Sequence, residues 1–149
     1  IARKGNLQEI QEIYKNNPTS IDSVDEKKSS PLLLACYRGN TDVALFLADK
    51  TKSINYNSGM GTALMATVMS GNATIVEKLI AVKADLNLAD TSGKTALIYA
   101  TFFNKINIAK LLLQAGADKN AKDVDNRTAL DYANFNKNTE LIILLNKQP

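Results

Sequence analysis

The chain has 149 residues, 45% of them hydrophobic and 22% charged, which is typical of a folded domain and excludes a disordered chain. Because there is no His and only one Cys, Cys36, the usual general base, the commonest zinc ligand and an internal disulfide are excluded. The net charge of +3 is too balanced to favour nucleic-acid binding, and no apolar run is long enough to span a membrane. We therefore expect no enzyme, no metal or cofactor, and neither a nucleic-acid partner nor membrane insertion.

One motif recurs four times along the chain and sets a period. It consists of a Ser or Thr, then Ala or Pro, then Leu, and it is found at 30–32, 62–64, 95–97 and 128–130. Its leucines lie 32 or 33 residues apart, and each is followed by an aliphatic residue 11 positions later and another Leu 15 positions later. An Asn stands 23 positions after each of the first three leucines. Features that share one period of this length indicate stacked structural repeats.

Each motif predicts the start of a first helix. Its Ser or Thr is placed to accept a backbone N–H of the first turn, and Pro31 suits the first helical position, where no N–H is needed. Thr128 and Asp131 have the spacing of a capping box. A left-handed residue is expected where each first helix ends, and the chain has Gly39, Gly71, Asn104 and Lys137 at these positions.

A second, more apolar helix is expected in each unit. The run from Ile106 to Leu113 is typical of these helices, and Gly116-Ala117-Asp118 closes it. Between units, Asp90-Thr91-Ser92-Gly93 has the composition of a tight turn. Two helices this short cannot bury their own apolar face, so such pairs are stable only when several of them stack into one continuous core.

These residues resemble an ankyrin repeat. The resemblance is carried by Thr95-Ala96-Leu97 with Ala100, by Ile108 with Leu111-Leu112-Leu113, and by Gly116-Ala117-Asp118 with Asn120. It covers one domain, 1–149, with a partial repeat at 1–21, full repeats at 22–54, 55–87 and 88–120, and a terminal repeat at 121–149. The fold that it implies is all-α, a solenoid of stacked helix-turn-helix units with β-turn or hairpin connections.

Two departures from the ankyrin pattern bear on the expected structure. The His that commonly follows the family's Thr-Pro-Leu, and that forms hydrogen bonds between units, is replaced by Leu33, Met65, Ile98 and Asp131. The segment from Asn55 to Thr62 is one residue shorter than its counterpart from Asn87 to Thr95, and Gly59 and Gly61 suit a tighter path. We therefore expect the middle hairpin to be the irregular one.

The resemblance implies a non-catalytic module that binds a partner protein or peptide on its concave side. Five residues after each repeat Leu stand Tyr37, Met69, Phe102 and Phe135, at a position whose family counterparts face outward. We call these four residues the apolar stripe and predict that they form the binding surface, since exposed aromatics and Met are typical of interaction hot spots. Arg38 and Phe103, one residue further on, are expected to widen it. The alternative is that these side chains fold back and cover the neighbouring helices.

Residues at the turn tips form a weaker candidate set, because these positions vary among ankyrin repeats and often contact partners. They are Glu26, Lys27, Thr91, Ser92, Lys94, Val124, Asp125 and Arg127. A solvated tip without a partner is the alternative for each of them. Two carboxylate pairs near these tips, Asp22 with Asp25 and Asp123 with Asp125, are expected to be solvated.

Three further expectations concern the whole protein. A regulatory or capping domain cut from a larger polypeptide is the alternative function, because the sequence starts at Ile1, within a unit. The cytoplasm is the default compartment, and a periplasmic or secreted location after removal of a signal peptide is the alternative. A monomer is expected.

Overall fold

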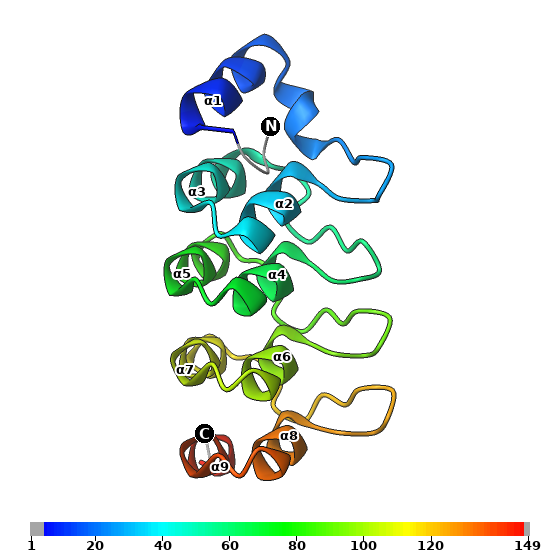
Figure 1. Cartoon of the computed structure of the whole chain (residues 1–149), viewed down its shortest axis with the longest axis vertical. Coiled ribbons are helices and arrows are strands. Elements are labelled where there is room, and N and C mark those ends of the chain that lie inside the picture. The colour runs from blue at the N-terminus through cyan, green and yellow to red at the C-terminus, as the bar shows by residue number, and fades with distance from the viewer. Residues whose placement is uncertain (1–4, 148–149) are drawn as a thin grey trace.

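The structure, a computed structural model, describes residues 5–147, and in this range it has nine α-helices and one 3-10 helix in a single stack (Figure 1). The elements are α1 (Leu7–Asn16), η1 (Pro18–Asp22), α2 (Pro31–Arg38), α3 (Thr41–Lys50), α4 (Ala63–Ser70), α5 (Ala73–Ala81), α6 (Ala96–Phe102), α7 (Ile106–Gln114), α8 (Ala129–Phe135) and α9 (Thr139–Asn146). The predicted all-α solenoid is confirmed. Within the described residues, none of these helices has the length and hydropathy needed to cross a membrane.

The stack has two columns of helices. The first helices of the units, α2, α4, α6 and α8, pack one upon the next, and the second helices α3, α5, α7 and α9 form a parallel column that α1 extends (Figure 1). Hairpin loops project from the side of the first column, away from the second helices (Figure 1). Each unit therefore contacts only its immediate neighbours, as in other repeat solenoids.

The first helices begin and end as the sequence predicts. The hydroxyl of each N-cap residue accepts a hydrogen bond from the backbone N–H three residues later, at Ser30, Thr62, Thr95 and Thr128. Thr128 also forms the predicted capping box with Asp131, whose carboxylate accepts the Thr128 N–H at 2.8 Å. The predicted left-handed conformation, with φ between +53° and +76°, is found at Gly39, Gly71, Asn104 and Lys137.

The residues that recur with the period build the core. The repeat leucines of the three earlier units are at most 2% exposed. The recurring second-helix positions are buried as well, at Val43, Leu47, Ile75, Leu79, Ile108, Leu112, Leu141 and Leu145. Leu130, the repeat Leu of the last unit, is only half-buried, because within the described residues no helix pair follows α8 and α9. Burial between neighbouring units is thus the main stabilising contribution.

Asn side chains are among the groups that form hydrogen bonds between units. The side-chain oxygen of Asn55 accepts the N–H of Asp85 at 2.8 Å, and that of Asn87 accepts the N–H of Asp118 at 2.8 Å. Of the residues at the family's His position, Met65 and Ile98 are buried instead. The recurring Asn therefore fixes the spacing of the units without a His.

The middle hairpin differs from the others, as predicted. In the other three hairpins an Asp carboxylate accepts two backbone N–H groups of its own turn, as Asp25 does at 2.8 and 2.9 Å. In the middle hairpin Asn57 accepts one, from Gly59, and forms an isolated bridge with Thr62. Gly61 has a φ of +130°, which side chains rarely adopt. The missing residue is thus accommodated by glycine.

Cys36 is fully buried in α2, and we expect its thiol to be unreactive in the folded protein. Burial raises the pKa of the thiol to about 12, despite an opposing hydrogen bond with Thr67. At pH 8 the native protein should therefore not react with Ellman's reagent, whereas one thiol per chain should react in 6 M guanidinium chloride. Thr74→Cys, on the exposed face of α5, is the control and should add one reactive thiol. Rapid labelling of native Cys36 would contradict the prediction.

Candidate functional site

The apolar stripe lies at the C-terminal ends of the four first helices. Its side chains are solvent-exposed: 55% at Tyr37, 43% at Met69, 45% at Phe102 and 84% at Phe135. The stripe runs from unit to unit because the first helices that carry it pack side by side (Figure 1). Of the residues expected to widen it, Phe103 is also exposed, and the Arg38 guanidinium lies 5.8 Å from the centre of the Tyr37 ring.

Aromatic rings cluster at the C-terminal part of the stripe. Phe102 contacts the Tyr132 ring edge-to-face, with centroids 5.6 Å apart, and Phe103 in the same geometry at 4.9 Å. Phe103 in turn stacks on Tyr99 at 6.1 Å. Phe102 is therefore partly covered by its neighbours, whereas Phe135 projects into solvent.

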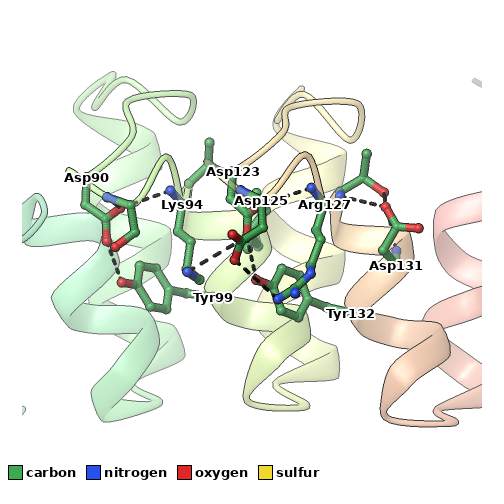
Figure 2. Close-up of polar contacts among 12 residues, drawn as sticks. Asp90, Lys94, Tyr99, Asp123, Asp125, Arg127, Asp131 and Tyr132 are labelled. Atoms are coloured by element: carbon green, nitrogen blue, oxygen red, sulfur yellow. Dashed lines mark hydrogen bonds and ion pairs between the residues drawn. The ribbon is translucent and has the colours of Figure 1, made fainter.

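Beneath this cluster, two Asp–Tyr pairs tie the hairpins to the first helices. The Tyr99 hydroxyl donates to Asp90 at 2.5 Å, and the Tyr132 hydroxyl donates to Asp123 at 2.5 Å (Figure 2). Burial first, and then the hydrogen bond to Asp90 and its negative charge, raise the pKa of Tyr99 to about 12. The two bonds fix the last two hairpins relative to α6 and α8.

The expectation that Asp123 is solvated is wrong. Its side chain is fully buried, because Tyr132 and the hairpin cover it and Lys94 of the preceding unit approaches at 3.8 Å (Figure 2). Burial alone would raise the pKa of this carboxyl. The hydrogen bond from Tyr132, the backbone N–H groups of Arg127 and Asp125, and the charge of Lys94 together hold the pKa below its ordinary value. The other three carboxylates of the two pairs remain partly or fully exposed.

Sequence reasoning missed Tyr99 and Tyr132 as part of the site. The signal was present, because each Tyr follows the turn Asp of its unit by nine residues. At the same position the earlier units have Leu34 and Ala66, which cannot form the bond. The pairs are therefore confined to the part of the array where the aromatic cluster lies.

A cavity of about 650 Å³ opens between the last two first helices and the last hairpin. We call it the aromatic cavity; it is lined by Phe102, Tyr132, Phe135, Asn126, Arg127 and Asp131. It brings together the predicted site residues Phe102, Phe135 and Arg127. Tyr37 and Met69 lie in earlier units, toward the N-terminal end of the stripe (Figure 1).

The turn-tip candidates are not equivalent in the structure. The side chains of five of them are exposed at the hairpins and do not hold units together: Glu26, Lys27, Thr91, Asp125 and Arg127. The backbone of the others, or their charge, links neighbouring units. Val124 donates its N–H to the Ser92 carbonyl at 3.0 Å, and Lys94 reaches Asp123. Among residues 5–147, no three Cys, Asp or Glu side chains gather where a metal ion could be held.

Stacked helix pairs joined by hairpins, with capped first helices and an apolar stripe beside the loops, define a helical-repeat solenoid. The chain belongs to the ankyrin-repeat family, since the family described as "Ankyrin repeats (3 copies)" matches residues 1–90 and again 64–148. Ankyrin repeats are a general protein–protein interaction module, and the family is generally non-catalytic.

Relatives with the same repeats are much longer proteins. The chain is 30% identical over 101 residues to the Ankyrin repeat domain-containing protein SAT10 of Stachybotrys chartarum, covering 68% of this chain and 5% of that protein. It is 32% identical over 104 residues to the Ankyrin repeat and SAM domain-containing protein 6 of Rattus norvegicus, covering 68% of this chain and 12% of that protein. The likeness thus concerns the repeats and a small part of each relative.

Proposed function

We propose that this chain binds a partner protein or peptide through the concave groove between its hairpins and first helices, and that it has no catalytic role. The observation that carries the proposal is the apolar stripe, in which a large apolar side chain is exposed at one position of four successive units. Single exposed apolar residues are normal on a protein surface. Aligned aromatics and Met on a continuous face have the composition of interaction hot spots.

Rigid presentation of the stripe supports this proposal. The Asp–Tyr pairs fix the hairpins on α6 and α8, and main-chain bonds join neighbouring hairpins, as from Thr91 N–H to the Gly59 carbonyl at 2.9 Å. A surface that is already ordered loses little conformational entropy when a partner binds. More of the contact free energy then contributes to affinity.

The double substitution Phe102→Ala and Phe135→Ala tests the proposal. We expect the free energy of unfolding to fall by only about 1 kcal/mol, or Tm by about 3 °C, because the Phe135 side chain is 84% exposed and that of Phe102 is 45% exposed. Capture of partner proteins from the native host, measured by quantitative mass spectrometry, should fall at least tenfold. Thermal unfolding followed by circular dichroism gives the stability of the same preparations.

The matched control is Val24→Ala with Ile143→Ala, which removes two exposed apolar side chains outside the stripe. This variant should retain the captured proteins. If instead both double variants lose the same proteins, the stripe is not the binding surface. If the Phe102 and Phe135 variant melts more than about 10 °C lower, the two rings serve the fold and the proposal is contradicted.

A second candidate is that the array is a regulatory or capping domain of a longer polypeptide. It is favoured by the relatives, of whose length the chain spans only 5% and 12%. In that case the stripe binds another domain of the same polypeptide. The complete open reading frame, followed by cross-linking mass spectrometry of its product, distinguishes an intramolecular from an intermolecular contact.

A further inference from the structure

The aromatic cavity offers apolar surface and no free hydroxyl. Phe102 and Phe135 contribute only ring atoms, and the hydroxyl of Tyr132 is already donated to the buried Asp123. Binding sites for side chains of partners are usually apolar pockets with a few polar groups at the rim. An apolar side chain of a bound peptide therefore suits the interior of this cavity, and a polar one would be left without a hydrogen-bond partner there.

The carboxylates near the cavity are already engaged. Asp123 is buried and accepts three hydrogen bonds, with Lys94 at 3.8 Å. Asp131 accepts both the N–H and the hydroxyl of Thr128, at 2.8 and 2.7 Å. The hydrogen bonds from the Thr128 hydroxyl and N–H lower the pKa of Asp131, so this carboxylate stays ionised within its capping box. Both carboxylates therefore already have the hydrogen-bond partners that stabilise their charge.

Arg127 is the cation at the rim of the cavity, and its guanidinium also interacts with the Tyr132 side chain. Its guanidinium contacts the Asp125 carboxylate at 3.4 Å, and both side chains are more than half exposed. An exposed ion pair of this kind contributes little, so a carboxylate arriving with a partner can replace Asp125. A planar guanidinium also binds a carboxylate through two parallel hydrogen bonds, which Asp125 at this distance does not provide.

We propose that the aromatic cavity binds an extended peptide segment in which an apolar residue is next to an acidic one. The apolar side chain enters between Phe102 and Phe135, and the neighbouring carboxylate binds Arg127. This inference rests on the proposed function and names the chemistry of its partner. A methylated lysine, which aromatic rings alone would suit, is disfavoured because the Arg127 guanidinium lines the same cavity and the Asp131 carboxylate there is bound to Thr128.

Fluorescein-labelled nonapeptides with Gly and Ser at the outer positions test the proposal by fluorescence anisotropy. The central residue is Phe flanked by Glu, Phe flanked by Lys, Ala flanked by Glu, or trimethyl-lysine flanked by Ser. We expect the first peptide to bind at least tenfold more tightly than each of the others. Its Kd should rise when the salt concentration is raised from 50 to 500 mM, since the carboxylate–guanidinium contact is screened.

Two variants separate the two parts of the motif. Arg127→Gln should remove the preference for Glu over Lys flanks but keep the preference for Phe over Ala. Phe135→Ala should do the opposite, and it leaves the fold intact because this ring is 84% exposed. Arg38→Gln, at the other end of the stripe, is the matched control and should change the Kd less than twofold.

The proposal is overturned if no peptide binds at millimolar concentration, or if the Lys-flanked, trimethyl-lysine or Ala peptide binds as tightly as the first. An equal effect of Arg38→Gln and Arg127→Gln also overturns it. The outcome is independent of the capture experiment on Phe102 and Phe135. If capture is lost in that variant and the acidic peptide fails, the groove binds a partner of other chemistry and only the present inference falls.

Discussion

The substitution Gly93→Ala is expected to lower the free energy of unfolding by about 3 kcal/mol. Gly93 has a φ of +73°, and a Cβ there would lie 2.9 Å from both the Asp123 Cα and the Val124 nitrogen. These are main-chain atoms of the next hairpin, so no side-chain rotation relieves the clash. Separation of the two hairpins would break the bond from Val124 N–H to the Ser92 carbonyl.

Gly116→Ala is the matched control for this prediction. Gly116 also has a positive φ, of +94°, but a Cβ there would meet nothing within 4 Å. The free energy of unfolding of this variant should fall by about 1 kcal/mol, from the backbone strain of an L-residue alone. Urea unfolding followed by circular dichroism measures both variants, and equal losses would show that the contact between hairpins is not what makes Gly93 necessary.

The second large effect is expected for Asp123→Ala, which should lower the free energy of unfolding by about 3 kcal/mol at pH 7. The substitution removes the acceptor of the Tyr132 hydroxyl and of two backbone N–H groups, and these donors are left without a partner. Asp125→Ala is the control from the same hairpin. Its exposed carboxylate contacts only Arg127, so its removal should change stability by less than about 0.5 kcal/mol.

The pH dependence of stability provides a second check on Asp123. The pKa of Asp123 is lower in the folded protein than the ordinary 3.8. As pH falls, this carboxylate is therefore protonated at a higher pH in the unfolded chain than in the folded one. The stabilisation from the ionised carboxylate is fully present at pH values well above 3.8 and is lost as pH falls below it toward the folded pKa. Wild-type stability should therefore fall more steeply between pH 5 and pH 3 than that of Asp123→Asn. Parallel curves would contradict this role.

The helices of the fold were predictable from the sequence because local chemistry determines them. Each first helix is capped through a contact with the residue three positions later, at Ser30, Thr62, Thr95 and Thr128. Gly39 ends its helix because it adopts the left-handed conformation, which depends on this residue alone. The irregular middle hairpin was likewise predictable, since a segment that is one residue shorter than its counterpart in the next unit must differ locally. Such features do not depend on which side chains meet across the stack.

Burial of Asp123 could not be predicted in the same way, because it depends on three separate segments. Tyr132 comes from the following helix, and Lys94 comes from the preceding unit. The exposure of the apolar stripe was predicted from its position in the repeat. The aromatic cavity could not be predicted, because it depends on how Phe102 and Phe135 of adjacent units are placed in space. Whether the stripe binds a partner remains a prediction that the two experiments above address.

The aromatic cavity joins two neighbouring units of the described array. Its walls come from α6 and α8, which belong to adjacent units, while α8 and α9 have a helical neighbour on only one side within the described residues. A helix pair that packs on one neighbouring pair opens more easily than a pair packed on both sides. A ligand that contacts both walls is bound only while these units stay docked, so occupancy slows the amide exchange of α8 and α9. A ligand in the aromatic cavity would therefore hold α8 and α9 against the preceding unit.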